Sequence, residues 1–401
     1  MPIWEIVVLS LYGLVVLATF LNHFALTAVL KRTLFFKPAA EPVEDREVPL
    51  VSIIVPAKDE EATIAQCLES LLGQDYPNLE IFVVDDRSDD RTAEIVRSFV
   101  ERDERIHLEQ VTELPPGWTG KTHALDQCQR RATGEYLLFV DADTRLQSSC
   151  VRVTVNEAIA SDAAMVSMMP SMDSRTFWER VIQPVAGWCL MLLFPLPKIN
   201  DPEQLDYGFA NGQYILVRRD AYDQIGGHEA VKDKFVEDIH LGRRIRRAGL
   251  GLRVALGPEL LTVRMYPSLS AILRGWSRIF YSAVDGRPGK MYGLLSLLSI
   301  FSGLSYVMLI GCGTLALLGY SCPFLWTMLG LGAAHQLFQS ALAARVYGLS
   351  HSDRRYLVFR ILAVGAMYVI GYRTIKMCKT GEVTWRGTTY GKELDQTSAT
   401  A

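Results

Sequence analysis

Two aspartates separated by one alanine end an apolar run in the middle of the chain. The run YLLFV (136–140) leads directly into Asp141 and Asp143. Carboxylates this close repel each other, and each is costly to remove from water, so the pair predicts a bound cation. Two more acidic pairs stand at the ends of apolar runs: Asp59 with Glu60, and Asp85 with Asp86.

The segments between these acidic pairs alternate in character. Short apolar runs, which we expect to be buried strands, occupy 51–57, 79–86, 105–111 and 135–143. Segments with helical spacing of apolar residues separate them, at 60–74, 88–103 and 121–133, and Ser88 is a favourable N-cap for the second. This alternation predicts an α/β fold with a mostly parallel sheet, in which ligands bind at the carboxyl ends of the strands. The acidic pairs all fall at that edge, so we expect them to form one site.

The acidic edge favours one class of ligand. The chain has neither a glycine-rich dinucleotide fingerprint nor a P-loop. Carboxylates suit the hydroxyl and imide donors of a nucleoside, and the Mg²⁺ or Mn²⁺ ions that they hold usually bridge substrate phosphates. The sequence therefore predicts a nucleotide diphosphate bound with a divalent metal. The alternative for any single acidic pair is a solvated loop.

Apolar stretches on both sides of this region indicate a membrane protein. Hydrophobic residues make up 49% of the 401 residues. Uncharged stretches cover 6–30 and 291–344; the first is long enough for one span, and the second for two, broken at 319–323. Lys31 and Arg32 follow the first stretch, so the positive-inside rule places Met1 outside and the following domain in the cytoplasm.

A shorter apolar run, Tyr356–Tyr372, contains Arg360. We expect it to be interfacial or re-entrant, because a further span would place the basic tail outside; that span is the alternative. The predicted organisation is an anchor at 1–32, a cytoplasmic catalytic domain at 48–285, a transmembrane pair at 290–345 and a helix with a cytoplasmic tail at 346–401. This layout predicts a multi-pass protein of the cell (inner) membrane.

The overall composition excludes other classes. A net charge of −3 gives no reason to expect a nucleic-acid partner. The seven cysteines have no paired spacing, so they predict reduced thiols rather than a disulfide framework or a zinc site.

Five segments in order resemble family-2 glycosyltransferases: VPAKDEEATIAQCLESLLGQDYP, EIFVVDDRSDDRT, GKTHALDQC, YLLFVDADT and FVEDIHLGRRIRRAG. The stretch LPPGWTGKTHAL and the layout of anchor and tail resemble the membrane branch that includes ceramide, carotenoid and hopene-associated glycosyltransferases, the last most of all. The resemblance covers about 51–280. It implies an A-type glycosyltransferase fold (a nucleotide-diphospho-sugar transferase), a nucleotide-sugar donor, Mg²⁺ or Mn²⁺, and inversion at the anomeric carbon.

The resemblance also implies a nucleotide pocket. Asp59 and Asp85 would contact the uracil and ribose of a UDP-sugar. The same pocket would be lined by Pro56, Ala57 and Glu60.

A second implied set would handle the diphosphate and the reaction. Asp143 would hold the metal on the diphosphate, and Asp141 would contact the ribose or the metal. Lys121 would lie near the nucleotide or diphosphate. Asp238 would be the catalytic base, with Glu237 beside it.

Elementary chemistry agrees with the role of Asp238. An acceptor hydroxyl needs a carboxylate to take its proton as it attacks the anomeric carbon. Asp238 opens DIHLGRRIRRAG, a predicted helix that ends at Gly249. The helix N-terminus would by itself lower the pKa of Asp238 and favour its ionised form. The alternative is an acid that only stabilises the helix.

The expected function is transfer of a single sugar from a UDP-sugar to a hydroxyl of a lipid or lipid-like acceptor in the membrane. One departure from the family concerns the [QR]xxRW motif, because alignment on Trp276 gives Ile272 and Gly275 at its other positions. Arg274 or Arg278 could substitute. The departure counts against a processive polysaccharide synthase, which is one alternative. The other is a non-catalytic nucleotide-sugar-binding membrane module, which would need no base.

Overall fold

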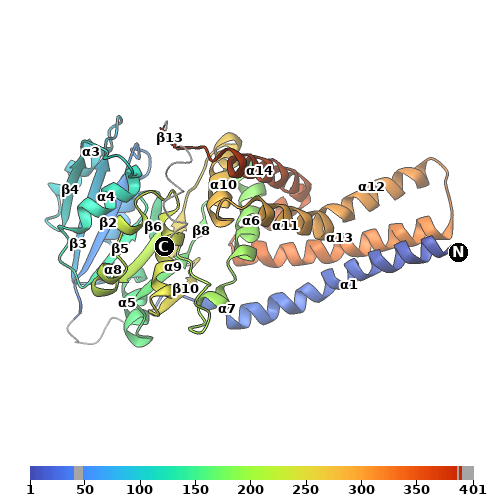
Figure 1. Ribbon diagram of the computed structural model, residues 1–401, viewed down its shortest axis with the longest axis horizontal. Helices are drawn as coiled ribbons and strands as arrows, with labels where there is room; N and C mark the ends of the chain where they lie inside the picture. Colours follow the sequence, from blue (N-terminus) through green and yellow to red (C-terminus); the bar gives the residue numbers. More distant parts are fainter. Residues whose placement is uncertain (40–47, 386–387, 391–401) are drawn as a thin grey trace. The chain divides into compact units, whose positions relative to one another are not determined.

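The computed structural model describes residues 1–39, 48–385 and 388–390. The chain divides into two compact units (Figure 1). Of the described residues, the α/β unit contains 33–173, 194–265, 382–385 and 388–390, and the helical unit contains 1–32, 174–193 and 266–381. The four-part division expected from the sequence remains a prediction, and most of its tail, beyond Tyr390, lies outside the described residues.

Within the described residues, an eight-stranded sheet forms the centre of the α/β unit. Its strands lie in the order β1 (Leu34–Phe35), β10 (Leu252–Leu256), β7 (Met165–Met169), β9 (Tyr214–Arg218), β5 (Tyr136–Val140), β2 (Val51–Ala57), β3 (Leu79–Asp86) and β4 (Ile106–Val111). Neighbouring strands pair in parallel except β9, which is antiparallel to both β5 and β7. The predicted mostly parallel α/β fold is confirmed.

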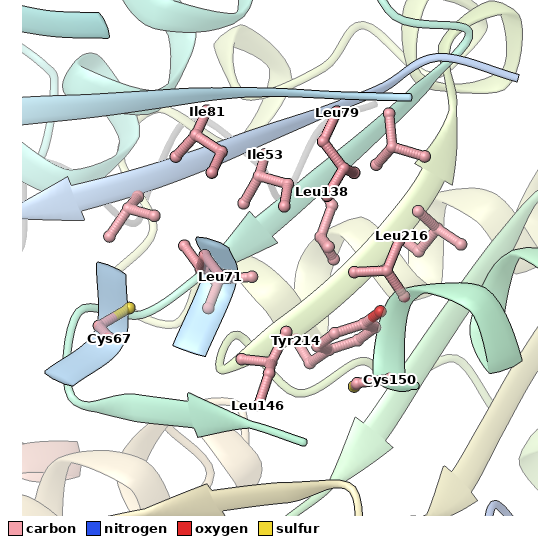
Figure 2. Packing of buried hydrophobic residues seen from close by; sticks show 14 of the residues in the cluster. Ile53, Cys67, Leu71, Leu79, Ile81, Leu138, Leu146, Cys150, Tyr214 and Leu216 are labelled. Atoms are coloured by element: carbon pink, nitrogen blue, oxygen red, sulfur yellow. The ribbon is translucent and has the colours of Figure 1, made fainter. Parts of the chain in front are cut away.

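The central strands are buried on both faces. Ile53 of β2 packs in one cluster with Leu138 of β5 and with Leu71 of α2 (Ile64–Leu72), as Figure 2 shows. Cys150 of α5 (Cys150–Ala160) belongs to the same cluster. Ile54, whose side chain must point to the opposite face, is also fully buried. Burial on both faces explains why the strand reads as a continuous apolar run.

Shorter elements complete the α/β unit. Its other helices are α3 (Thr92–Val100), α4 (Gly120–Gln129), α7 (Leu196–Ile199), α8 (Arg219–Gln224), a 3₁₀ turn (Glu229–Val231) and α9 (Glu237–Arg247). A small sheet has the order β6 (Thr144–Leu146), β11 (Leu261–Val263) and β8 (Ser171–Met172), and β12 (Val383–Trp385) pairs with β13 (Thr388–Tyr390). Gly249 follows α9 with φ +73°, which confirms the predicted end of that helix. The predicted N-cap at Ser88 is wrong, because α3 begins at Thr92.

The helical unit holds the long apolar helices. Its elements are α1 (Ile3–Arg32), α6 (Phe177–Leu193), α10 (Leu269–Ala283), α11 (Pro288–Leu298), a π-helical turn (Ser299–Gly303), α12 (Leu304–Leu317), α13 (Pro323–Leu349), a 3₁₀ turn (Arg354–Phe359) and α14 (Arg360–Thr380). Among the described residues, three helical stretches are long and apolar enough to cross a membrane: Ile3–Arg32, Pro288–Leu317 and Arg354–Thr380. The third contains the run that we expected to be interfacial or re-entrant, whereas α13, an expected span, is not among the three.

Contacts nevertheless place α13 beside α1, and the two helices run in the same direction (Figure 1). Near the start of both helices, the rings of Trp4 and Phe324 lie 5.3 Å apart. Further along both, the Arg345 guanidinium donates a hydrogen bond of 2.8 Å to the carbonyl of His23. The less apolar α13 therefore lies along much of the length of the apolar α1.

The helix α14 packs on the first half of the Pro288–Leu317 stretch. The hydroxyls of Tyr368 and Ser299 lie 2.7 Å apart. A Cβ added to Gly371 would lie 2.7 Å from the Leu295 side chain, so the helices approach closely there.

The departure from the [QR]xxRW motif at Gly275 has a steric explanation. Trp276 is buried, and its ring nitrogen donates to Gln183 Oε1 at 2.9 Å. A Cβ at Gly275 would lie 2.0 Å from the ring of Tyr266, so an arginine has no room at that position. Arg274 hydrogen-bonds the Ser270 side chain one turn earlier in α10.

Candidate active site

Lys121 lies at the centre of the acidic residues. It occupies the first turn of α4, a helix that Thr119 caps by accepting a hydrogen bond from the Thr122 amide. The Lys121 ammonium lies 2.7 Å from Asp141 Oδ1, just after β5, and 2.8 Å from Glu237 Oε1, the first residue of α9. Burial alone would lower the pKa of Lys121, but the surrounding carboxylates raise it well above its ordinary value. Lys121 is therefore a fixed positive charge that joins two elements distant in sequence.

Asp238 is held by two backbone amides. The amide of Gly212 donates to Oδ2 at 2.6 Å, and the amide of Ile239 donates to Oδ1 at 2.7 Å. Burial and then the neighbouring Glu237 raise the pKa of Asp238 to about 7, against the opposing effects of Lys121 and the two amides. The expected effect of the helix N-terminus is present, because the Ile239 amide lowers this pKa, but desolvation outweighs it and the net pKa is raised.

One carboxylate oxygen of Asp143 is buried without a hydrogen-bond partner. This atom is Oδ1, and it accepts no hydrogen bond within the part of the chain that the structure describes. Burial, followed by the charges of Asp141 and Glu60, raises the pKa of Asp143 well above its ordinary value. An unpartnered buried carboxylate oxygen beside a second carboxylate is suited to a hard cation.

The residues present fit a metal that is shared with a ligand. Among the described residues, no group of three histidine, cysteine, aspartate or glutamate side chains is placed to hold an ion. Mg²⁺ and Mn²⁺ need no such cage, because they commonly take one or two carboxylates and complete their shell with water and substrate phosphates. Asp143 and Asp141 could supply those carboxylates.

The ends of β2 and β3 form the other part of the edge. Ala57 of β2 pairs in register with Asp85 of β3. The Asp85 carboxylate accepts hydrogen bonds from the Ser88 amide and from Gln110 Nε2, both at 3.3 Å. Asp59 has φ +53°, in the left-handed region that aspartate tolerates better than most residues. Its amide donates to Ser88 Oγ at 3.0 Å, so Ser88 joins the two loops instead of capping α3.

The remaining predicted residues lie at the same edge. Pro56 is half-buried and Ala57 is buried at the end of β2. The amide of Glu60 donates to Thr92 Oγ1 at 2.8 Å, and its carboxylate accepts from Thr63 Oγ1 at 2.9 Å. Because the charge of Glu60 also raises the pKa of Asp143, Glu60 links the β2 loop to the Lys121 cluster.

The structure thus brings the predicted residues to one edge of the sheet, in two groups. Direct contacts join Lys121, Asp141 and Glu237, and Ser88 joins Asp59 to Asp85. Sequence reasoning missed Gly212, which contacts Asp238, and it missed the ion pair between Lys121 and Asp141. The only sequence signal for Gly212 was its place among small residues in FANGQY.

The topology of the sheet and the acidic residues at its carboxyl edge define an A-type glycosyltransferase fold. Residues 52–226 match the model of the family described as "Glycosyl transferase family 2". The expected fold and the expected resemblance to this family are confirmed.

Curated relatives share part of this region. A 4,4'-diaponeurosporenoate glycosyltransferase of Staphylococcus aureus (strain USA300) is 26% identical over 249 residues, which cover 60% of this chain and 63% of the relative. The protein of the same description from strain MRSA252 is 26% identical over 255 residues, which cover 62% of this chain and 65% of the relative. The match thus spans less than two thirds of each relative's length.

Solved structures with a similar arrangement include the mannosyltransferase PcManGT from Pyrobaculum calidifontis, in complex with GDP-Man and Mn²⁺. It is 19% identical with a TM-score of 0.49, and the match covers 91% of this chain and 99% of that one. S. aureus TarS 1–349 in complex with UDP-GlcNAc is 16% identical with a TM-score of 0.41, and the match covers 86% of this chain and 96% of that one.

Proposed function

We propose that the protein is a membrane-bound, inverting glycosyltransferase that moves one sugar from a UDP-sugar to a hydroxyl of a membrane lipid. The observation that carries this proposal is Asp238. It is a half-buried carboxylate with a pKa raised to about 7, held by two amides next to the fixed charge of Lys121. A general base is most effective when its pKa lies near the working pH.

In the proposed reaction, Asp238 takes the proton of the acceptor hydroxyl while the hydroxyl oxygen forms a bond to the anomeric carbon. The bond between that carbon and the diphosphate breaks, and its electron pair leaves with UDP. One direct displacement inverts the anomeric configuration. A divalent cation held by Asp143 and Asp141 would offset the charge that develops on the leaving diphosphate. Lys121 would add a second positive charge at the same place.

The base argues for a hydroxyl as the attacking group. A carboxylate acceptor is already ionised near neutral pH and needs no base, whereas a hydroxyl must lose its proton during attack. The name of the curated relatives, 4,4'-diaponeurosporenoate glycosyltransferase, supports an apolar lipid as the acceptor class. We therefore propose a hydroxyl on a long apolar molecule that stays in the bilayer.

The donor pocket would lie at the ends of β2 and β3. Asp85 and Asp59 would accept hydrogen bonds from the uracil imide and the ribose hydroxyls. Pro56, Ala57 and Glu60 would line the pocket. The loops are already tied together by Ser88 and its contacts, which reduces the entropy lost when the nucleotide binds.

The helical unit would anchor the enzyme. Lys31 and Arg32 follow the apolar part of α1, so we propose that Met1 lies outside and the α/β unit in the cytoplasm. Since α13 runs in the same direction as α1, it would return the chain to the cytoplasmic side. Tyr368 and Gly371 of α14 contact the first half of the Pro288–Leu317 stretch. Among the contacts of the described residues, Arg360, at the start of α14, reaches no further along that stretch than Tyr306. We propose that α14 enters from the cytoplasmic side and does not span.

Release of UDP tests the proposal. Purified protein is incubated with a panel of UDP-sugars, Mn²⁺ or Mg²⁺ and a membrane-lipid extract, and products are analysed by mass spectrometry. The expected result is lipid carrying one added sugar, with UDP release that Asp238→Asn suppresses. A ladder of added sugars would support a processive synthase instead. Binding of UDP-sugars without turnover, equal in wild type and Asp238→Asn, would support a binding module.

A further inference from the structure

Gly212 lies between the carboxylate of Asp238 and the ammonium of Lys121. A Cβ added to Gly212 would lie 3.0 Å from Asp238 Oδ2 and 3.2 Å from Lys121 Nζ. Both distances are shorter than ordinary van der Waals contact to carbon. The absence of a side chain at this position therefore leaves a small space that is bordered by a base and a cation.

The segment that carries Gly212 cannot easily move away from α9. A Cβ at Gly208 would lie 2.3 Å from the Arg243 Cα, and a Cβ at Gly242 would lie 2.5 Å from the Phe209 carbonyl carbon. These two glycines allow the backbones of the segment and the helix to touch. Because the segment and α9 are already in contact, the backbone cannot shift toward α9 to make room for a side chain at Gly212.

The far end of the segment is also fixed. The Asn211 amide donates to Ser167 Oγ at 2.9 Å, and Asn211 Nδ2 donates to the Met168 carbonyl at 2.8 Å. The Tyr214 amide donates to the Asn211 carbonyl at 3.0 Å, which closes the turn that leads into β9. Gly212 is thus held by the sheet on one side and by α9 on the other.

We propose that Gly212 is a positioning residue of the acceptor site: its amide orients the Asp238 carboxylate, and its missing side chain keeps open the space between Asp238 and Lys121 that the attacking acceptor oxygen enters. This inference rests on the proposed function. An oxygen in that space can pass its proton to Asp238 as it attacks the anomeric carbon. The second lone pair of Asp238 Oδ2 is available, because one hydrogen bond from Gly212 uses only the first.

The substitution Gly212→Ala tests the proposal, because it keeps the amide and adds only a methyl group. Transfer to the lipid should fall by about 10²-fold, the loss that a misplacement of about 1 Å can cause. UDP affinity should stay within about twofold, because the nucleotide lies elsewhere in the proposal. The acidic limb of the pH profile should stay at about 7, because Asp238 keeps its hydrogen bond. Hydrolysis of the donor by water, a smaller acceptor, should fall less than transfer.

A matched control is Gly73→Ala in the same unit. A Cβ at Gly73 would meet its nearest atom, a backbone oxygen, at 3.4 Å, which is ordinary contact, and φ there is −81°. This variant should keep both transfer and UDP affinity. Unchanged transfer in Gly212→Ala would overturn the proposal, and a joint loss of transfer and UDP affinity would assign Gly212 to the donor site.

A second measurement does not depend on the folding or activity of a Gly212 variant. In wild-type protein labelled with ¹⁵N-glycine, the Gly212 amide should shift with pH around a midpoint of about 7, as Asp238 titrates. The shift should vanish in Asp238→Asn. An amide that ignores pH in the wild type would overturn the hydrogen bond. A wild type that shows this titration but releases no UDP from any donor would instead contradict the proposed function.

Discussion

Removal of the Lys121 charge should move the acidic limb of the pH–rate profile to higher pH. Asp238 must be ionised to accept a proton, and its pKa is raised to about 7, so the rate should fall as the pH falls through about 7. The charge of Lys121 lowers this pKa and so favours the ionised form. In Lys121→Met that help is lost, and a higher pH is needed to ionise the base.

The geometry sets the size of the effect. Lys121 Nζ and Asp238 Oδ2 lie 3.2 and 3.0 Å from the same point, the Cβ position of Gly212, so they are at most about 6 Å apart. At an effective dielectric constant of about 20, unit charges at that distance interact by about 3 kcal/mol, or about two pH units. Asp141 and Glu237 also interact with the ammonium, so we expect a displacement of about one to two pH units.

The assay is kcat/KM for the sugar donor between about pH 5 and about pH 10, which reports ionisations of the free enzyme. If Lys121 contacts the diphosphate, losing that contact in Lys121→Met would lower the plateau of the profile. Losing the effect of Lys121 on the pKa of Asp238 would instead move the acidic limb to higher pH. Arg131→Met is the control, because this exposed side chain pairs with Glu109 and should leave the limb in place. An acidic limb that stays near pH 7 in Lys121→Met would refute the reasoning.

Three further predictions concern the base, the metal and the topology. Asp238→Asn should reduce transfer by at least about 10²-fold with UDP affinity kept within about twofold by calorimetry, and near-normal turnover would move the role to Glu237. Asp143→Asn should not lower the unfolding midpoint of the free protein, since it removes a buried carboxyl with a raised pKa, but it should abolish stabilisation by Mn²⁺ with UDP. Stabilisation that survives both the substitution and a chelator would contradict a metal at Asp143. Cys322, exposed between α12 and α13, should react with an impermeant maleimide in intact cells, whereas buried Cys67 should not; a reaction only after lysis would place that loop inside.

The sheet and its acidic edge could be predicted because each depends on local pattern. Apolar runs such as 51–57 and 79–86 are strands in the structure with nearly the predicted bounds. Parallel strands share one edge, so the ends that carry Asp59, Asp85 and Asp141 had to meet there. None of this requires knowledge of which side chains touch.

The contacts inside the site could not be predicted, because they depend on elements that meet only in the folded chain. Lys121 and Glu237 are 116 positions apart, and no local pattern records that their side chains lie 2.8 Å apart. The pKa of Asp238 shows the same limit. Its place at a helix N-terminus is visible in the sequence, but the burial that outweighs the helix dipole is a property of tertiary packing.

The distribution of charge explains how one carboxylate of the site can bind a cation while another acts as a base. Among the described residues, the Lys121 ammonium makes short ion pairs with two carboxylates of this edge, Asp141 and Glu237. Two others, Asp143 and Asp238, have pKa values raised by burial, so near neutral pH each favours its proton more than an exposed aspartate does. The raised pKa of Asp143 means that its ionised carboxylate lacks a compensating positive charge, so Asp143 is suited to bind a cation. For Asp238 burial brings the pKa close to the working pH, which suits a base. The Lys121 ammonium thus neutralises Asp141 and Glu237, while burial leaves Asp143 suited to hold a cation and Asp238 suited to exchange a proton.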